Sequence, residues 1–336
     1  MRKKLIASVA TLCLSAGVLS ACGSNADSND TKGGKSVEIS IFAGSLPEAS
    51  PTGEGVKAMI AALDKANVGI KATGFYDTSL GDATTMIQGL QQGTIDVGVA
   101  GNAYYSGLVP QVQVFELPFL FEDIEEARKI TAPGKVRDEV FKHFDNTDIV
   151  GLSLWEGGIR QLSNNKRPVK TPEDLKGIKI RTLPAPIQQA AWKEMGALPQ
   201  AIDSAELYTA LQQGTVEAQE NPLYEIEFRK FYEVQKYISM TSHVYTPFTM
   251  GVSRATWNKL NDEQKKALQD AAEVGREAQL AANDKANAAA KDKLIANGIK
   301  FEENPDRAAF KELAVKVWSM FTEKNGSELL DMIQGK

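Results

Sequence analysis

Alternating apolar and polar residues recur in short runs along the chain, with longer amphipathic segments between them. The short runs predict strands over 37–42, 95–99 and 149–155 and over 178–180, where Ile alternates with polar neighbours. The segments between the strands predict helices, for example over 53–65. Strands that alternate with helices predict an α/β protein.

A short sequence pattern occurs twice in the same order. Residues 69–71 read GIK and residues 90–96 read LQQGTID, whereas residues 177–179 read GIK again and residues 211–217 read LQQGTVE. In both copies a strand, a connection, a helix, a glycine that ends the helix and a second strand follow one another, which predicts one βαβ-like unit used twice. Because 336 residues exceed what one hydrophobic core usually supports, we expect two lobes with one copy in each.

Polar residues follow the strands of the second copy. The strand over 178–180 places Arg181 at its carboxyl end, and the strand through Val216 and Ala218 ends at Asn221. Ligands of open α/β sheets bind just outside the carboxyl ends of strands, and a guanidinium together with an amide suits a carboxylate. An arginine at a strand end is also commonly solvated or salt-bridged, and Asn-Pro commonly opens a turn, so these residues alone leave both interpretations open.

Other strand ends carry further polar residues. Asn102 and Tyr104 follow the second strand of the first copy, and Glu156 and Arg160 follow the strand over 149–155. Two similar lobes with polar loops at corresponding strand ends predict a cleft between the lobes.

The C-terminal part of the sequence is dominated by one long helical segment. Asn261 is a capping residue in front of an Ala-rich run over 262–297, and Gly298 follows the run. Such a helix would be ~50 Å long if it is unbroken, which is enough to bridge two lobes. A dimerising coiled coil is the alternative, but the apolar positions are mostly Ala, so we expect packing against the same chain.

The N-terminus has the pattern of a secretion signal. Three basic residues precede an apolar run over 5–19, which is too short for a permanent membrane span. The run ends in LSAC, which matches the lipobox of bacterial lipoproteins, so we expect a signal peptide over 1–21, cleavage before Cys22 and a lipid on its thiol. The alternative is cleavage after Ala21 with an incidental cysteine. Residues 22–36 are small and polar, which predicts a flexible tether.

Charge and cysteine content narrow the function further. Removal of the signal peptide takes away three positive charges and no negative ones, so the formal net charge changes from −5 to −8. An acidic chain without basic clusters argues against nucleic acid as a partner. Cys13 leaves with the signal peptide, so Cys22 has no disulfide partner within the mature chain.

The motifs of common enzyme classes are missing from the sequence. His143 and His243 are far apart, and neither has metal-ligand spacing. GLSLW at 151–155 lacks the final glycine of a nucleophile elbow, and there is no P-loop. GEGVKA at 53–58 matches a dinucleotide-binding pattern superficially, but a Pro-containing loop separates it from the preceding strand, so we interpret it as a helix start. We therefore expect neither catalysis nor a cofactor or metal.

Several segments together resemble a known transport family. The chain resembles the DctP-type extracytoplasmic solute-binding proteins of tripartite ATP-independent periplasmic (TRAP) transporters over nearly all of its mature length. The resemblance is carried by LPFLF (117–121), RQLSNNKRPVKTPEDLKGIKIR (160–181), ELYTALQQGTVEAQENPL (206–223) and KFYEVQKYISMT (230–241).

The resemblance implies a fold and a binding site. It implies a two-lobed periplasmic-binding-protein-like α/β fold, with a ligand cleft between the lobes and the long C-terminal helix bridging them. Residues 37–157 with 247–286 would form lobe I, and residues 158–246 with 287–336 would form lobe II. In the family, the Arg of the KIR motif pairs with the substrate carboxylate and the Asn of the ENP motif supports it, which assigns these roles to Arg181 and Asn221. A further ligand contact falls on Arg160.

The resemblance also implies partners and a substrate class. A membrane-anchored, monomeric lipoprotein on the periplasmic side or the outer face of the cell membrane would capture an organic acid and deliver it to an ion-gradient-driven TRAP permease. Polar residues at the expected cleft could bind hydroxyls and favour a sugar acid, such as a uronate or aldonate; they are Asn102, Tyr104, Glu156 and Asp203. A C4-dicarboxylate stays open as the substrate. The alternatives are an ABC-type binding protein or sensor for an organic anion and, less favoured, a sugar-acid hydrolase or lyase.

Overall fold

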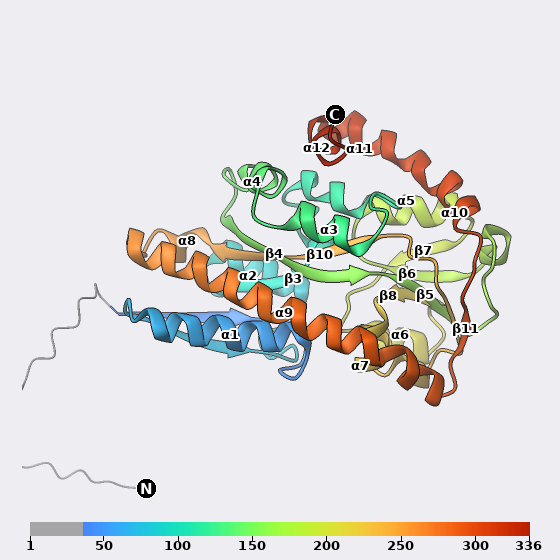
Figure 1. The fold of residues 1–336 in the computed structure, drawn as a ribbon, viewed down its shortest axis with the longest axis horizontal. Helices are drawn as coiled ribbons and strands as arrows, with labels where there is room; N and C mark the ends of the chain where they lie inside the picture. The colour runs from blue at the N-terminus through green and yellow to red at the C-terminus, as the bar shows by residue number, and fades with distance from the viewer. Residues whose placement is uncertain (1–35) are drawn as a thin grey trace, which may run out of the picture. The chain divides into compact units, whose positions relative to one another are not determined.

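The computed structural model describes residues 36–336 (Figure 1). The predicted signal peptide, Cys22 and all of the predicted tether except Ser36 lie outside the described residues. In the described part the strands form two sheets. The first sheet has the order β2-β1-β3-β10-β4 and consists of β1 (Val37–Phe42), β2 (Ile70–Phe75), β3 (Val97–Gly101), β4 (Ile149–Ile159) and β10 (Tyr245–Ser253).

The second sheet has the order β11-β9-β5-β8-β6-β7. Its strands are β5 (Gln161–Asn164), β6 (Lys179–Thr182), β7 (Leu198–Ala201), β8 (Ala218–Asn221), β9 (Tyr237–Ser239) and β11 (Lys300–Glu302). In both sheets a parallel group lies beside antiparallel strands: β1 is parallel to β2 and β3, and β6 is parallel to β7 and β8. The predicted α/β class is therefore confirmed.

Two neighbouring chain segments run between the first sheet and the second. The chain leaves β4 of the first sheet, passes through Arg160 and enters β5 of the second sheet. It returns from β9 to β10, and the backbone N–H of Arg160 donates to the carbonyl oxygen of Val244 at 3.0 Å between these two connections. Arg160 therefore lies at the junction of the sheets.

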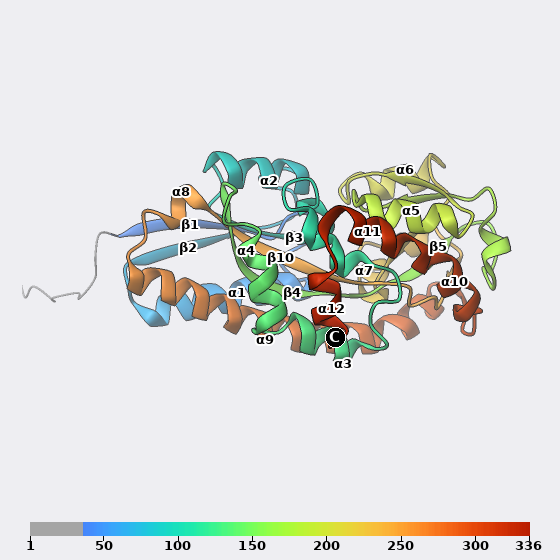
Figure 2. The same ribbon diagram turned by 90° about the horizontal axis from the view of Figure 1, so that it is seen from above.

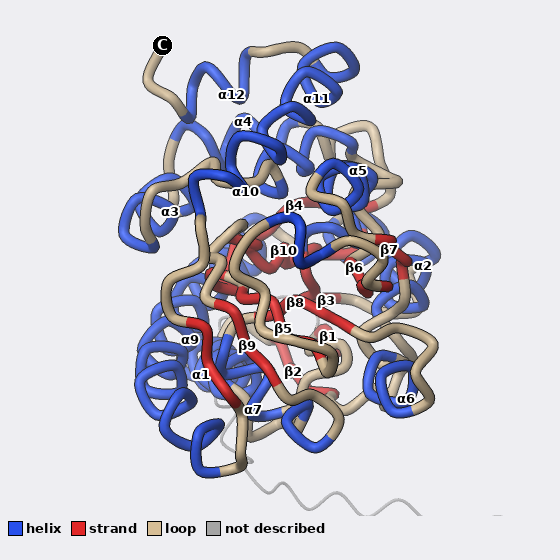
Figure 3. Tube along the Cα trace, turned by 90° about the vertical axis from the view of Figure 1, so that its right-hand side faces the viewer, coloured by secondary structure: helices blue, strands red, loops and turns tan. Residues whose placement is uncertain are grey.

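Helices cover the sheets on opposite sides. Figures 1 and 3 show α1 and α9 beside each other on one side of the strands and the helices α3, α4, α5 and α10–α12 on the other, and Figure 2 shows the long helix α9 running along α1 from above. The α-helices are α1 (Pro51–Ala66), α2 (Ala83–Gln92), α3 (Ile124–Thr131), α4 (Lys135–Lys142), α5 (Pro186–Glu194), α6 (Leu207–Gln212), α7 (Leu223–Phe228), α8 (Arg254–Trp257), α9 (Asp262–Ala296), α10 (Arg307–Ala314), α11 (Trp318–Asn325) and α12 (Glu328–Ile333). Short 3₁₀ helices are η1 (Asn102–Tyr105), η2 (Pro110–Glu116), η3 (Pro172–Leu175), η4 (Phe231–Glu233) and η5 (Val315–Val317).

The long helix α9 bridges elements of both sheets, as predicted. Asn261 and Gln264 cap each other at its start, which satisfies two backbone donors that the first turn would otherwise leave unpaired. The helix packs against α1 and β4 and, further along, against α7, which directly follows β8 of the second sheet. Its small residues allow a close crossing, because a Cβ atom on Gly275 would lie 2.8 Å from the carbonyl oxygen of Gly55. This crossing explains Gly55 of GEGVKA, which lies inside α1, whereas a Cβ atom on Gly53 would meet the backbone of Glu48 in the preceding loop.

The repeated pattern has the same local structure but different strand neighbours. Gly93 and Gly214 both end a helical segment with positive φ, 74° and 71°, as the glycines of LQQGT predict. In the second copy β6 pairs directly with β8, whereas in the first copy β1 lies between β2 and β3. The two copies therefore resemble each other as local units and are built differently into their sheets.

The C-terminal helices return toward the first sheet. α10 contacts α5, but α12 contacts α4 and η2, which lie between β3 and β4 in the chain. The predicted boundaries of lobe I and lobe II stay a prediction. Across residues 36–336, no helix combines the length and the apolar character that crossing a bilayer requires.

Candidate functional site

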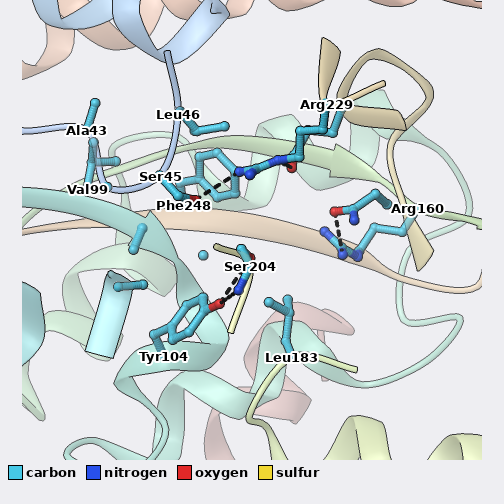
Figure 4. A pocket seen from close by; sticks show the side chains of 16 residues that line it. Ala43, Ser45, Leu46, Val99, Tyr104, Arg160, Leu183, Ser204, Arg229 and Phe248 are labelled. Atoms are coloured by element: carbon cyan, nitrogen blue, oxygen red, sulfur yellow. Dashed lines mark hydrogen bonds and ion pairs between the residues drawn. The ribbon is translucent and has the colours of Figure 1, made fainter. Parts of the chain in front are cut away.

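A cavity lies where the carboxyl ends of four strands meet. β1 and β3 of the first sheet and β6 and β8 of the second sheet all end at its wall. The lining consists of Ala43, Gly44, Ser45, Leu46, Ala83, Val99, Ala100, Gly101, Tyr104, Phe248, Arg160, Leu183, Ser204, Asn221, Glu225 and Arg229 (Figure 4). Its free volume is only about 30 Å³, which is room for a few water molecules, so the side chains around the cavity are closely packed. The position matches the expected cleft at corresponding strand ends.

Arg181 lies in β6, fully buried behind this cavity wall. Its Nε donates to the carbonyl oxygen of Ile202 at 2.8 Å, and its Nη2 donates to the hydroxyls of Ser204 at 3.0 Å and Tyr104 at 3.4 Å. Its Nη1 has no hydrogen-bond partner in the described chain, and no described carboxylate forms an ion pair with it. Burial lowers the pKa of Arg181, because a cation without an anionic partner is poorly stabilised away from water.

Tyr104 and Ser204 separate Arg181 from the cavity, and they come from different sheets. Tyr104 follows β3 and Ser204 follows β7. The two hydroxyls are 3.0 Å apart, and the backbone N–H of Ser204 donates to the hydroxyl of Tyr104 at 2.9 Å. Burial raises the pKa of Tyr104, so its hydroxyl is protonated at neutral pH. Arg181 is thus surrounded by neutral oxygens, which are weaker partners for a guanidinium than a carboxylate.

Arg160 and Asn221 lie on the cavity wall and bind each other. Nη2 of Arg160 donates to Oδ1 of Asn221 at 2.8 Å, and Nδ2 of Asn221 donates to Gln219. Arg160 is also paired with the fully buried carboxylate of Glu220. Its charge is therefore already balanced inside the protein, in contrast to that of Arg181.

Glu220 connects this pair to a buried histidine. Nε2 of His243 lies 3.2 Å from Oε2 of Glu220, and Nδ1 lies 2.8 Å from the hydroxyl of Thr241. Burial by itself would raise the pKa of Glu220, but the charge of Arg160 and the hydrogen bond from His243 lower it to about 2. Burial lowers the pKa of His243 despite the hydrogen bond to Glu220, so the imidazole is neutral at neutral pH.

Asn102 and Glu156, which were expected at the cleft, do not line the cavity. Asn102 is fully buried; its Nδ2 donates to the carbonyl oxygen of Val112 at 2.7 Å, and its Oδ1 accepts from Thr249 at 2.9 Å. Glu156 accepts two hydrogen bonds from Arg128, at 2.7 and 2.9 Å. Their polar atoms are thus bound within the protein, and we assign both to its framework.

Asp203 lies at the edge of the site rather than on the cavity wall. Its Oδ1 accepts from the backbone N–H of Ala205 at 3.0 Å, and its Oδ2 is buried without a partner in the described chain. Its neighbour Ser204 lines the cavity. The structure therefore brings together Arg181, Tyr104, Arg160 and Asn221, with Asp203 beside them.

The sequence analysis missed an ion pair on the cavity wall. Nε of Arg229 donates to Oε2 of Glu225 at 3.1 Å, and Nη2 of Arg229 donates to the hydroxyl of Ser45 at 3.0 Å (Figure 4). Glu225 lies in α7, directly after the ENP segment, and Arg229 ends that helix. Their spacing of four residues suggests a helical ion pair, but the sequence gives no sign that Ser45 lies opposite. Within residues 36–336 no three His, Cys, Asp or Glu side chains are placed to hold a metal ion.

The family model and the relative that this chain resembles both belong to one class of proteins, the extracellular solute-binding proteins. Residues 42–325 match the model of the bacterial extracellular solute-binding proteins, family 7 (DctP). The 2,3-diketo-L-gulonate-binding periplasmic protein YiaO of Escherichia coli is 38% identical over 264 residues, which cover 77% of this chain and 80% of that protein.

Solved structures agree in fold. A TRAP periplasmic solute-binding protein from Polaromonas bound to D-erythronate has a TM-score of 0.84 and 31% identity, covering 88% of this chain and 98% of that one. The sugar acid binding protein DctPAm from Advenella mimigardefordensis in complex with galactonate has a TM-score of 0.85 and 28% identity, covering 90% and 97%. The match confirms the predicted two-lobed fold. The chain therefore belongs to the bacterial extracellular solute-binding proteins of family 7, the DctP family, which are transport proteins rather than enzymes and bind small carboxylates for TRAP permeases.

Proposed function

We propose that the cavity binds a sugar acid and that Arg181 pairs with the carboxylate of this ligand. The observation that carries the proposal is the state of Arg181, a buried guanidinium whose Nη1 has no partner among residues 36–336 and whose described neighbours are neutral oxygens. A carboxylate offers two anionic oxygens to the fixed fork of donors, so it satisfies the guanidinium better than hydroxyls do.

Binding then requires Tyr104 and Ser204 to move, because their hydroxyls lie between Arg181 and the cavity. Opening of the cleft separates these residues, since they come from elements of different sheets. A ligand that contacts both sides stabilises the closed state over the open one. Asn221 lines the same cavity and adds an amide to the ligand contacts, and Arg160, which lies beside it on the cavity wall, orients Asn221.

Relatives support a hydroxylated acid as the ligand. The E. coli relative is named for 2,3-diketo-L-gulonate, and the two structural neighbours hold D-erythronate and galactonate. We extend this class, a carboxylate on a chain of hydroxylated carbons, to the present chain. The protein would act as a monomer anchored through a lipid on Cys22 and would deliver the acid to a TRAP permease in the membrane.

A ligand screen tests the proposal. The purified protein is heated with erythronate, galactonate, gluconate, glucuronate and galacturonate, and a ligand at 100 times its Kd should add ~2.7 kcal/mol to the free energy of unfolding. We expect at least one of these acids to stabilise the protein and Arg181→Ala to lose that effect. Equal stabilisation of wild type and Arg181→Ala would exclude Arg181 as the anchor.

A further inference from the structure

The ion pair of Arg229 and Glu225 forms a second polar group on the cavity wall. Both residues line the cavity, and their charged atoms are 3.1 Å apart. Figure 4 shows Arg229 with Ser45 on one side of the cavity and Tyr104 with Ser204 on another. A ligand whose carboxylate binds at Arg181, behind Tyr104 and Ser204, therefore directs its other end toward the Arg229 side.

The three arginines at this site differ in how their charges are balanced. Arg160 pairs with Glu220, and Arg229 pairs with Glu225, whereas Arg181 contacts a backbone carbonyl and two hydroxyls. Among the described residues, the site thus offers one guanidinium whose charge no contacting carboxylate balances. A ligand with one carboxylate can pair it with Arg181. A second carboxylate would have to compete with Glu225 for Arg229, which is already paired.

Glu225 makes the Arg229 side unfavourable for a second anion. Its carboxylate is 6% exposed and accepts hydrogen bonds from Arg229 and, at 3.4 Å, from Tyr224. A ligand carboxylate at Arg229 would lie close to this like charge in a site with little water, where repulsion is weakly screened. A ligand hydroxyl has no such conflict, because it can accept from the guanidinium and donate to the carboxylate.

We propose that Arg229, Glu225 and Ser45 form a distal subsite that binds the hydroxylated end of a monocarboxylic acid and rejects a second carboxylate. This inference rests on the proposed function and decides between two of its substrate classes, since it favours sugar acids over dicarboxylates. Ser45 contributes from the loop after β1, so the subsite joins elements of both sheets. The hydroxyl of Ser45 already accepts a hydrogen bond from Nη2 of Arg229, and a ligand hydroxyl would accept from this guanidinium in the same way.

The test compares matched acids that differ only in the second carboxylate. The pairs are erythronate with meso-tartrate, gluconate with glucarate and galactonate with galactarate, measured by calorimetric titration. For the pair that binds, we expect the monocarboxylate to bind the wild-type protein at least tenfold more tightly than the dicarboxylate. Glu225→Gln frees the charge of Arg229 and keeps the size of the side chain. In this variant the ratio of the dicarboxylate Kd to the monocarboxylate Kd should fall at least tenfold.

A double variant shows whether the change acts through Arg229. In Glu225→Gln combined with Arg229→Gln, the dicarboxylate should lose the affinity it gained in the single variant, whereas a general loosening of the cavity would leave that gain in place. If Glu225→Gln does not fold, Arg229→Gln alone supplies the test, because it leaves Glu225 unpaired and should raise the ratio.

The outcomes separate this inference from the proposed function. A wild-type protein that prefers a dicarboxylate, or a ratio that stays the same in Glu225→Gln, overturns the distal subsite while Arg181→Ala still abolishes binding. Failure of all six acids, and also of glucuronate and galacturonate, to bind overturns the proposed ligand class, and the distal subsite with it.

Discussion

The hydroxyl of Tyr104 and the guanidinium of Arg181 lie 3.4 Å apart, although one residue follows β3 of the first sheet and the other lies in β6 of the second. The same hydroxyl accepts from the backbone N–H of Ser204. One neutral side chain thus joins the elements of both sheets directly at the proposed carboxylate anchor, and its contacts compete with those of a ligand.

Tyr104→Phe removes this hydroxyl, which leaves the backbone N–H of Ser204 without an acceptor and Nη2 of Arg181 with the hydroxyl of Ser204 alone. We expect the free energy of unfolding of the ligand-free protein to fall by about 1–3 kcal/mol, measured by urea denaturation. The ligand Kd should change less than tenfold, because the carboxylate itself supplies the acceptors for Arg181. Tyr237→Phe in β9 is the matched control, since the structure gives its hydroxyl no hydrogen bond. A Kd that rises more than a hundredfold in Tyr104→Phe would mean that the tyrosine binds the ligand directly.

Arg160→Met leaves Glu220 buried without its cation. Removal of one partner of a buried ion pair costs about 3–5 kcal/mol, so we expect a loss of this size in urea denaturation. Adding Glu220→Gln removes the unpaired charge and should recover part of the loss. If Arg160→Met lowers ligand affinity but leaves the free energy of unfolding unchanged, the arginine acts as a ligand contact, as the family resemblance implied, and not through Glu220.

Glu116 makes the stability of the protein depend on pH near neutrality. Burial raises its pKa from 4.5 to about 7, although Thr246, Asn102 and Gln188 donate hydrogen bonds to it. Because its pKa is higher in the folded state, the folded protein binds more protons between these values. Its contribution to the free energy of unfolding is therefore fully present below pH 4.5 and falls as the pH rises to about 7, by up to ~3 kcal/mol.

The variant Glu116→Gln tests this dependence. Urea denaturation at several values between pH 4.5 and 8 should show a smaller fall in the free energy of unfolding for Glu116→Gln than for wild type. Glu220 does not interfere, because its low pKa places its own contribution between pH 4.5 and about 2, where stability is lost as the pH falls. Parallel curves for the two proteins would show that Glu116 is ionised in the folded state.

The sequence predicted local structure well, because local signals determine it. Strand β1 and helix α9 have the predicted starts, since alternation and the cap at Asn261 act over a few residues. The GIK and LQQGT segments also fold as expected. The order of strands in each sheet was not predictable in this way, because the insertion of β1 between β2 and β3 depends on packing between distant segments.

From the sequence, the residues of the candidate site could be predicted only where they lie at predicted strand ends. Arg181 and Asn221 end their strands, and the family resemblance gave them roles that the residue types alone left open. Asn102 directly follows β3, and Glu156 was predicted to follow a strand but lies within β4. Their side chains bind Thr249 and Arg128 inside the protein. Nothing in a linear sequence shows which partner a polar side chain finds after folding. The contact of Arg229 with Ser45 was missed for the same reason, since 184 residues separate the two.

Gly275→Ala tests the close crossing of α9 and α1. A Cβ atom at this position would lie 2.7 Å from the ring of Trp155 and 2.8 Å from the carbonyl oxygen of Gly55, and the ring is fully buried and cannot move away freely. Alanine normally favours a helix over glycine, so any loss of stability must come from the forced separation of the helices. We expect the free energy of unfolding to fall by about 1–3 kcal/mol, as for other overpacked cores. Gly107→Ala is the matched control, because a Cβ atom there meets nothing within 4 Å. A Gly275→Ala protein as stable as the wild type would show that α9 can shift along α1, and ligand titration of that variant would then measure how far closure of the cleft depends on the position of α9.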